Sequence, residues 1–236
     1  MELMEIFKDA LAYPVNNIKA LLIYAVLGII LGIATIGTVT AISVSYAAEN
    51  ILALIGSGIL GIIVALIIGF LISGYELDIV KYGIQRDEGA PAIDFIRQFI
   101  NGVKYFVVSI VYMIIPIVVA SLLAIFFQNW ISQLILVILT IIFSLALIMA
   151  QCRLAKTEDL GSALAIGEAI GDITRVGVVK LILFIIAMFI ILFVLYFIVM
   201  LIAQWNSTIG GILMGILGVY TTFFMARATG LLYSEV

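Results

Sequence analysis

The stretch GYELDIVKYGIQRDEGAPAIDFIRQFINGVKYFVVSIVYMIIP, residues 74–116, decides the fold. It leaves an apolar segment at Gly74-Tyr75 and crosses a charged connector with a turn at Gly89-Ala90-Pro91. It then runs through a segment with apolar residues three and four apart, as far as Lys104, and enters a second apolar segment. Long apolar segments that alternate with charged connectors are typical of a polytopic membrane protein.

The composition excludes a water-soluble globule. Of 236 residues, 66% are hydrophobic and 11% are charged, and the mean hydropathy is +1.37, so too few polar side chains are present to cover a globular surface. The amino terminus is acidic and amphipathic, so we expect no cleaved signal peptide. One cysteine, Cys152, and no histidine exclude an internal disulfide, a cysteine-only metal site and the usual hydrolase triads. We therefore expect no enzyme and no cofactor.

Six apolar segments of about twenty residues predict six transmembrane helices, because a helix satisfies its own backbone hydrogen bonds in the hydrocarbon core. They cover approximately residues 20–41, 51–75, 105–127, 134–150, 181–203 and 209–226. No charged residue lies near the middle of a span, which argues against a proton- or ion-coupled pump. The predicted fold class is all-α integral membrane, and residues 1–236 are expected to form a single transmembrane domain.

The positions of the basic residues predict the orientation. Every Lys and Arg lies before the first span, in the second-to-third or fourth-to-fifth connector, or after the last span. The three other links contain none, and Glu49 is their only charged residue. The positive-inside rule then predicts a multi-pass protein of the cell membrane with both termini and both long connectors in the cytoplasm.

The chain contains an internal repeat, with units at about residues 3–75, 92–152 and 163–228. Each unit has an amphipathic segment, a span, a polar link and a returning span. The apolar stripe of the second amphipathic segment, for example, is Ile93, Ile96, Phe99, Ile100 and Val103. We expect these three segments to be helices that lie in the cytoplasmic interface before they turn into the membrane. Alternatively, they are cytoplasmic helices that pack on one another.

Several motifs resemble the domain of unknown function 4013 family of polytopic membrane proteins, which is seen mainly in archaea. They are GYELDIVKYG before the third span, MAQCRLAKTEDLGSALAIGEAIGDI before the fifth, the opening FKDALAYP and the closing FFMARATGLLYSE. The resemblance covers nearly the whole chain. It implies the polytopic fold, and it implies no activity and no site residues.

Small residues and one proline inside the spans are candidates for helix packing. Small residues four apart let helices approach closely in lipid, and Pro116 is expected to kink the third span because it removes a backbone donor. These faces pack either within the chain or as a seam of a homo-oligomer. The glycines concerned are Gly28, Gly32, Gly211 and Gly215.

Cytoplasmic cations form the candidate binding site, if the three units surround one axis. They are expected to contact anionic lipid headgroups or a protein partner. The alternative is a solvated surface in which Asp94, Glu168 and Asp172 pair with the neighbouring cations. The five candidate residues are Arg97, Lys104, Arg153, Arg175 and Lys180.

Two functions follow from these patterns. The first is a non-enzymatic scaffold or subunit that binds lipid or a partner through its cytoplasmic amphipathic helices. The alternative is an uncoupled permease for a small molecule or lipid, built from the three repeats around a cavity. Membrane lipids are the expected partners, with a protein partner or a second copy of the chain as further candidates, and no nucleic acid is expected.

Overall fold

The computed structural model describes residues 1–126 and 130–236, with the side-chain surroundings of all of these except positions 124, 207, 208, 211 and 212. Every regular element in this part of the chain is an α-helix. In chain order the helices are α1 (Leu3–Asn16), α2 (Ile18–Ala47), α3 (Ile51–Gln85), α4 (Phe95–Phe126), α5 (Trp130–Thr157), α6 (Leu160–Leu164), α7 (Ile166–Val176), α8 (Val178–Trp205) and α9 (Ser207–Tyr233).

The predicted all-α membrane architecture with six spans is confirmed. In the described residues, six helices are long and apolar enough to cross a membrane, namely α2, α3, α4, α5, α8 and α9. Consecutive spans pack together as the hairpins α2–α3, α4–α5 and α8–α9. Most spans bury little of their surface inside the chain, since 11% of the most apolar window of α3, α5 or α8 is buried, whereas 56% of that of α9 is buried.

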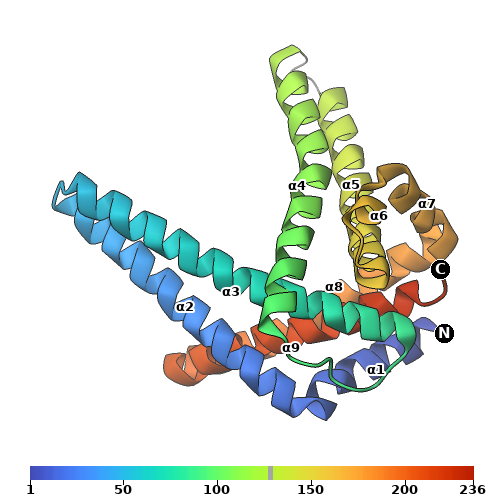
Figure 1. Ribbon diagram of the computed structural model, residues 1–236, viewed down its shortest axis with the longest axis horizontal. Helices are drawn as coiled ribbons and strands as arrows, with labels where there is room; N and C mark the ends of the chain where they lie inside the picture. Colours follow the sequence, from blue (N-terminus) through green and yellow to red (C-terminus); the bar gives the residue numbers. More distant parts are fainter. Residues whose placement is uncertain (127–129) are drawn as a thin grey trace.

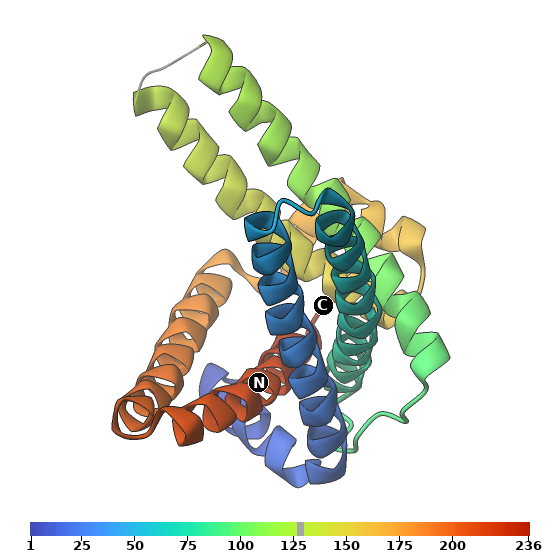
Figure 2. The ribbon, with the colours of Figure 1, turned by 90° about the vertical axis from the view of Figure 1, so that its left-hand side faces the viewer.

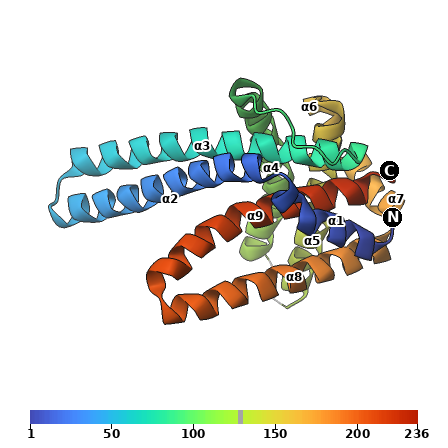
Figure 3. The same cartoon turned by 90° about the horizontal axis from the view of Figure 1, so that it is seen from below.

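The three hairpins diverge from one end of the molecule (Figures 1 and 2). That end is formed by α1, α6, α7, the connector 86–94 and the adjoining ends of the spans, and we call it the base. Both chain termini lie there (Figure 1). Figure 3 shows the α2–α3 hairpin and α8 on opposite sides of α9. Segments that are far apart in the sequence therefore meet at the base.

Short breaks and capping residues set the helix boundaries. Asn17 leaves the helical conformation between α1 and α2, with φ −112° and ψ 41°. The side chains of Asn50 and Asn206 accept hydrogen bonds from the backbone amides of Ala53 and Ile209 and so cap α3 and α9. Gly177 separates α7 from α8 with φ +95°, a conformation that glycine adopts without steric cost.

Two boundaries differ from the sequence prediction. The second span was expected to end near Tyr75, but α3 continues to Gln85. The second amphipathic segment was expected to turn before the third span, but α4 runs unbroken from Phe95 to Phe126. The first and third of these segments do form separate helices, α1 and α7.

A close crossing of α3 and α4 lies in the unbroken part of α4 between the amphipathic segment and the span. A β-carbon added at Gly74 would lie 1.8 Å from the Gln98 carbonyl oxygen, and one added at Gly102 would lie 2.0 Å from the Phe70 carbonyl oxygen. The two backbones therefore touch where each helix carries a glycine. Small residues permit such contact between helices in lipid. A turn in α4 at this point would break the contact.

Aromatic side chains fill the core of the base. The rings of Tyr24 and Tyr75 stack with centroids 4.0 Å apart, and Phe223 packs against both. Phe7 of α1 stacks on Phe184 of α8 at 5.2 Å. Aromatic pairs of this kind contribute about 0.5–1.5 kcal/mol beyond the burial of their area. The base is thus the packed part of the chain.

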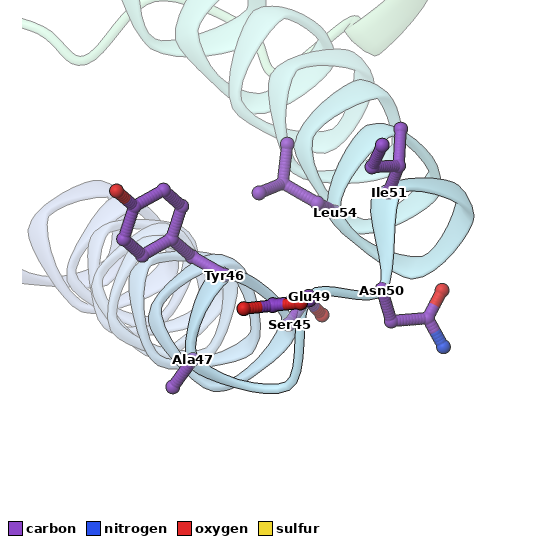
Figure 4. A pocket seen from close by; sticks show the side chains of 7 residues that line it. All are labelled: Ser45, Tyr46, Ala47, Glu49, Asn50, Ile51 and Leu54. Carbon is purple, nitrogen blue, oxygen red and sulfur yellow. The ribbon is translucent and has the colours of Figure 1, made fainter.

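The far end of the α2–α3 hairpin is open and polar. A cavity of about 590 Å³ lies at this turn and is lined by Ser45, Tyr46, Ala47, Glu49, Asn50, Ile51 and Leu54. Figure 4 shows Tyr46 of α2 and Leu54 of α3 on facing sides of this cavity. Most of its lining residues are exposed, so it is a surface indentation at the hairpin turn.

Candidate functional site

The base contains a buried guanidinium, that of Arg227 near the end of α9. Its Nε lies 2.7 Å from Asp9 Oδ1 and its Nη2 3.1 Å from Asp9 Oδ2. Its Nη1 donates to the Asp87 carbonyl oxygen, and its guanidinium lies 4.9 Å from the centre of the Tyr13 ring. Because only 1% of Arg227 is exposed, this ion pair holds α1 and the connector against α9.

A second pair joins Arg97 of α4 to Asp78 of α3. Two parallel hydrogen bonds of 3.0 and 2.9 Å connect the guanidinium to the carboxylate, the geometry in which Arg binds a carboxylate most specifically. The Gln98 amide also donates to Asp78, and the Tyr24 hydroxyl donates to Gln98 Oε1 at 2.6 Å. This buried network links α2, α3 and α4.

A third pair joins Arg153 of α5 to Asp172 of α7 at 3.1 Å. Asp172 is fully buried and also accepts from Arg175 at 2.7 Å and from the Tyr233 hydroxyl at 2.6 Å. Arg153 Nε donates to the Ser162 carbonyl oxygen. The network connects α5, α6, α7 and the end of α9, so each of the three hairpins is tied to the base by an Arg–Asp pair.

Two exposed ion-pair groups surround these networks. Lys81 Nζ lies 2.5 Å from Glu158, and Lys104 donates to the Glu158 carbonyl oxygen. Lys180 Nζ lies 2.5 Å from Glu235, which also pairs with the terminal ammonium group. The hydrogen bond from Lys81 lowers the pKa of Glu158, and those from Lys180 and the terminal ammonium lower the pKa of Glu235 to about 2.

All five predicted contact residues lie at the base, and each has an intramolecular partner. Arg97 and Arg153 contact buried aspartates, Lys104 contacts a carbonyl oxygen, and Lys180 contacts Glu235. Arg175, 57% exposed, pairs with Glu168 and Asp172. The expected pairing of Asp94 with Arg97 takes another form, since Asp94 accepts from the Arg97 backbone amide.

The predicted packing residues have different surroundings. A β-carbon at Gly28 would lie 3.1 Å from Val219 Cγ2, whereas one at Gly32 or Gly215 would meet no heavy atom within 4 Å. The surroundings of Gly211 lie outside the described residues. Pro116 is buried within the unbroken α4. Whether these faces form a seam between two copies stays a prediction.

Sequence reasoning missed three groups of residues at the base. Asp9, Asp78 and Gln98 form the ion-pair networks, Gly74 and Gly102 form the α3–α4 crossing, and Gly83 and Gly230 form a second crossing. At the latter, a β-carbon on Gly230 would lie 2.3 Å from the Val80 carbonyl oxygen. One signal was present, because Asp78 follows an apolar span by a single turn, where a carboxylate needs a partner.

The described residues contain no group of three or more Cys, Asp or Glu side chains that could hold a metal ion. An all-helical chain whose six apolar helices meet at a polar base is a multi-pass membrane protein. Residues 57–204, more than half of the chain, match the family described as "Protein of unknown function (DUF4013)", so the chain belongs to that family. The resemblance noted in the sequence is thereby confirmed. No curated protein and no solved structure matches the chain.

Proposed function

We propose that this protein is a non-enzymatic membrane scaffold or subunit that holds a lipid or a protein partner through the amphipathic segments at its base. The observation that carries the proposal is an exposed apolar surface at the start of α4, the second of these segments. Ile96 is 78% exposed and Ile100 51% exposed, and both lie within one turn of the paired Arg97. An apolar surface of this kind beside neutralised charges favours lipid or an apolar partner.

The charges of the base serve a different role in this proposal. Because the candidate cations already have carboxylate or carbonyl partners, an anionic headgroup has to share each cation with an existing partner. Exposed pairs contribute only about 0.2–1 kcal/mol, but a pair with a buried carboxylate is far harder to break. The Arg–Asp pairs therefore fix the hairpins, and the apolar residues make the contact.

The three Arg–Asp pairs also support a repeated unit. Asp172 precedes the first span of the third unit and pairs with Arg153, at the end of the second unit. In the same way, Asp9 precedes the first span of the first unit and pairs with Arg227, at the end of the third unit. In the middle unit the polarity is reversed, with Arg97 before the span and Asp78 at the end of the preceding one. In the proposed architecture, three equivalent hairpins share one clamp design.

Native mass spectrometry of the protein in mild detergent tests the proposed function. The wild-type chain is expected to retain a lipid or a partner protein in fixed stoichiometry. The double variant Ile96→Gln and Ile100→Gln is expected to lose it at both low and high salt, because the contact is apolar. Leu52→Gln, at a residue that is 85% exposed near the far end of the α2–α3 hairpin, is the matched control. A wild-type chain that carries nothing, or a double variant that retains its ligand, would contradict the proposal.

A further inference from the structure

The groove between α3 and α4 has the features of a binding site. Its volume is about 260 Å³ and it is lined by Ala65, Leu66, Gly69, Phe70, Ser73, Gly102, Tyr105, Phe106 and Ser109. Sites for whole small ligands usually measure about 300–1,000 Å³. The groove is therefore suited to one part of a longer molecule, such as the neck of a membrane lipid.

Glu76 follows Ser73, a residue that lines this groove, by one turn of α3 in the direction of the base. Gly69, Ser73 and Glu76 follow one another at intervals of four and three residues, which places them on one face of α3. Tyr105, which lines the groove from α4, is close enough to Glu76 for the two groups to interact electrostatically. The carboxylate thus lies one turn beyond the groove, between the apolar part of α3 and the charged base.

Glu76 is an acidic side chain without a cationic partner. In residues 1–126 and 130–236 its one hydrogen bond comes from the Gln151 amide at 2.8 Å, and no Lys, Arg or terminal ammonium lies within ion-pair distance of it. The nearby Lys81 and Lys104 are both directed to Glu158. A partly buried carboxylate in an apolar setting is stabilised by a cation.

The walls of the groove also favour a cation. Phe70 and Phe106 lie with ring centroids 5.4 Å apart, and Tyr105 adds a third aromatic ring. The negative faces of such rings attract ammonium groups within about 6 Å. An anionic headgroup would meet Glu76 with a like charge.

We propose that this groove binds a membrane lipid whose headgroup carries a primary ammonium group, with Glu76 as its carboxylate partner and the aromatic rings around the ammonium. The apolar residues Ala65 and Leu66 then contact the start of the acyl chains. The inference rests on the proposed function in its lipid-binding form, and it adds this groove to the contact surface at Ile96 and Ile100.

The test uses full-length protein in detergent, titrated with phosphatidylethanolamine, phosphatidylcholine or phosphatidylglycerol of identical acyl chains, with bound lipid counted by native mass spectrometry. We expect phosphatidylethanolamine to bind most tightly. Glu76→Gln should weaken it about tenfold, the effect of losing one charge-assisted hydrogen bond. The glutamine keeps a partner for Gln151, and Glu88→Gln, on the exposed connector, is the control.

A second pair of variants tests the groove itself. A β-carbon at Gly69 or at Gly56 meets no heavy atom within 4 Å, so a side chain can begin at either position without displacing a neighbouring backbone. Gly69→Leu fills the groove and should reduce phosphatidylethanolamine binding, whereas Gly56→Leu, near the far end of α3, should leave it unchanged. Equal binding of the three lipids, or unchanged binding in both Glu76→Gln and Gly69→Leu, would overturn the inference.

Three further outcomes separate related explanations. Displacement of the lipid by an equimolar amount of free ethanolamine would show a site for soluble amines and would overturn the lipid assignment. In one outcome, the Glu76→Gln protein loses its lipid preference while the double variant Ile96→Gln and Ile100→Gln still retains a ligand. The proposed function would then fail, and the groove assignment would stand. If lipid stayed bound in fixed stoichiometry without any headgroup preference, the groove assignment would fail while the proposed function stood.

Discussion

Removing either partner of the Arg227–Asp9 pair should destabilise the protein, and by unequal amounts. Breaking a buried pair typically costs about 3–5 kcal/mol, because the remaining charge loses both water and its partner. Arg227 has 1% of its side chain exposed and Asp9 has 31%. The guanidinium left behind by Asp9→Asn therefore has almost no access to water, whereas the carboxylate left behind by Arg227→Met is partly solvated.

The magnitudes follow from this difference in exposure. We expect Asp9→Asn to lower the free energy of unfolding by about 3–4 kcal/mol, in the range for an uncompensated buried charge. Arg227→Met retains the apolar stem and should cost about 2 kcal/mol, including the donor lost by the Asp87 carbonyl oxygen. Equilibrium unfolding by sodium dodecyl sulfate in mixed micelles measures both values. Equal losses, or losses below about 0.5 kcal/mol as for an exposed pair, would refute this account of the base.

Three further predictions concern the base and the termini. Asp78→Arg should destabilise the fold, and adding Arg97→Asp should recover more than half of the loss in unfolding temperature. The double variant places Arg at the end of a returning span and Asp before the next span, as in the other two pairs. Purely additive effects would contradict the shared clamp design. Gly102→Ala should lower the free energy of unfolding by about 1–3 kcal/mol through its clash with the Phe70 carbonyl oxygen, whereas Gly215→Ala should be neutral or stabilising. Equal effects of the two variants would exclude the close crossing. The folded-state pKa of Glu235 is lowered from 4.5 to about 2, so its contribution to stability is complete above pH 4.5 and is lost as the pH falls toward 2. The difference in unfolding temperature between wild type and Glu235→Gln should therefore shrink over that range. A constant difference would count against the pairing.

The spans were predictable because composition alone determines them. Twenty consecutive apolar residues are accommodated as a membrane helix. The cytoplasmic location that the Lys and Arg positions predict for the connectors stays a prediction. The extension of α3 beyond Tyr75 was missed for a related reason. Charged residues such as Asp78 were interpreted as the start of a loop, although the helix simply leaves the apolar region and continues.

The partners of the charges could not be predicted from sequence spacing. Asp9 and Arg227 are separated by 218 positions, and no periodicity connects them. Glycine patterns were equally ambiguous. Gly28 and Gly32 have the spacing of a packing motif, yet the closest backbone contacts occur at Gly74 and Gly102, which lie on different helices. A short-range pattern identifies a small face, while the crossing geometry decides which face is used.

The most direct test of the account is the placement of the base and the hairpin turns on opposite sides of the membrane. Single cysteines at Glu49, Asn206 and Glu88, in a chain with Cys152→Ala, are treated in intact cells with a membrane-impermeant maleimide. Glu49 and Asn206 follow α2 and α8 and are exposed, and Glu88 lies on the exposed connector of the base. We predict labelling at Glu49 and Asn206 in intact cells and at Glu88 only after lysis. Labelling of Glu88 in intact cells, or different results for Glu49 and Asn206, would contradict a six-span protein with a cytoplasmic base.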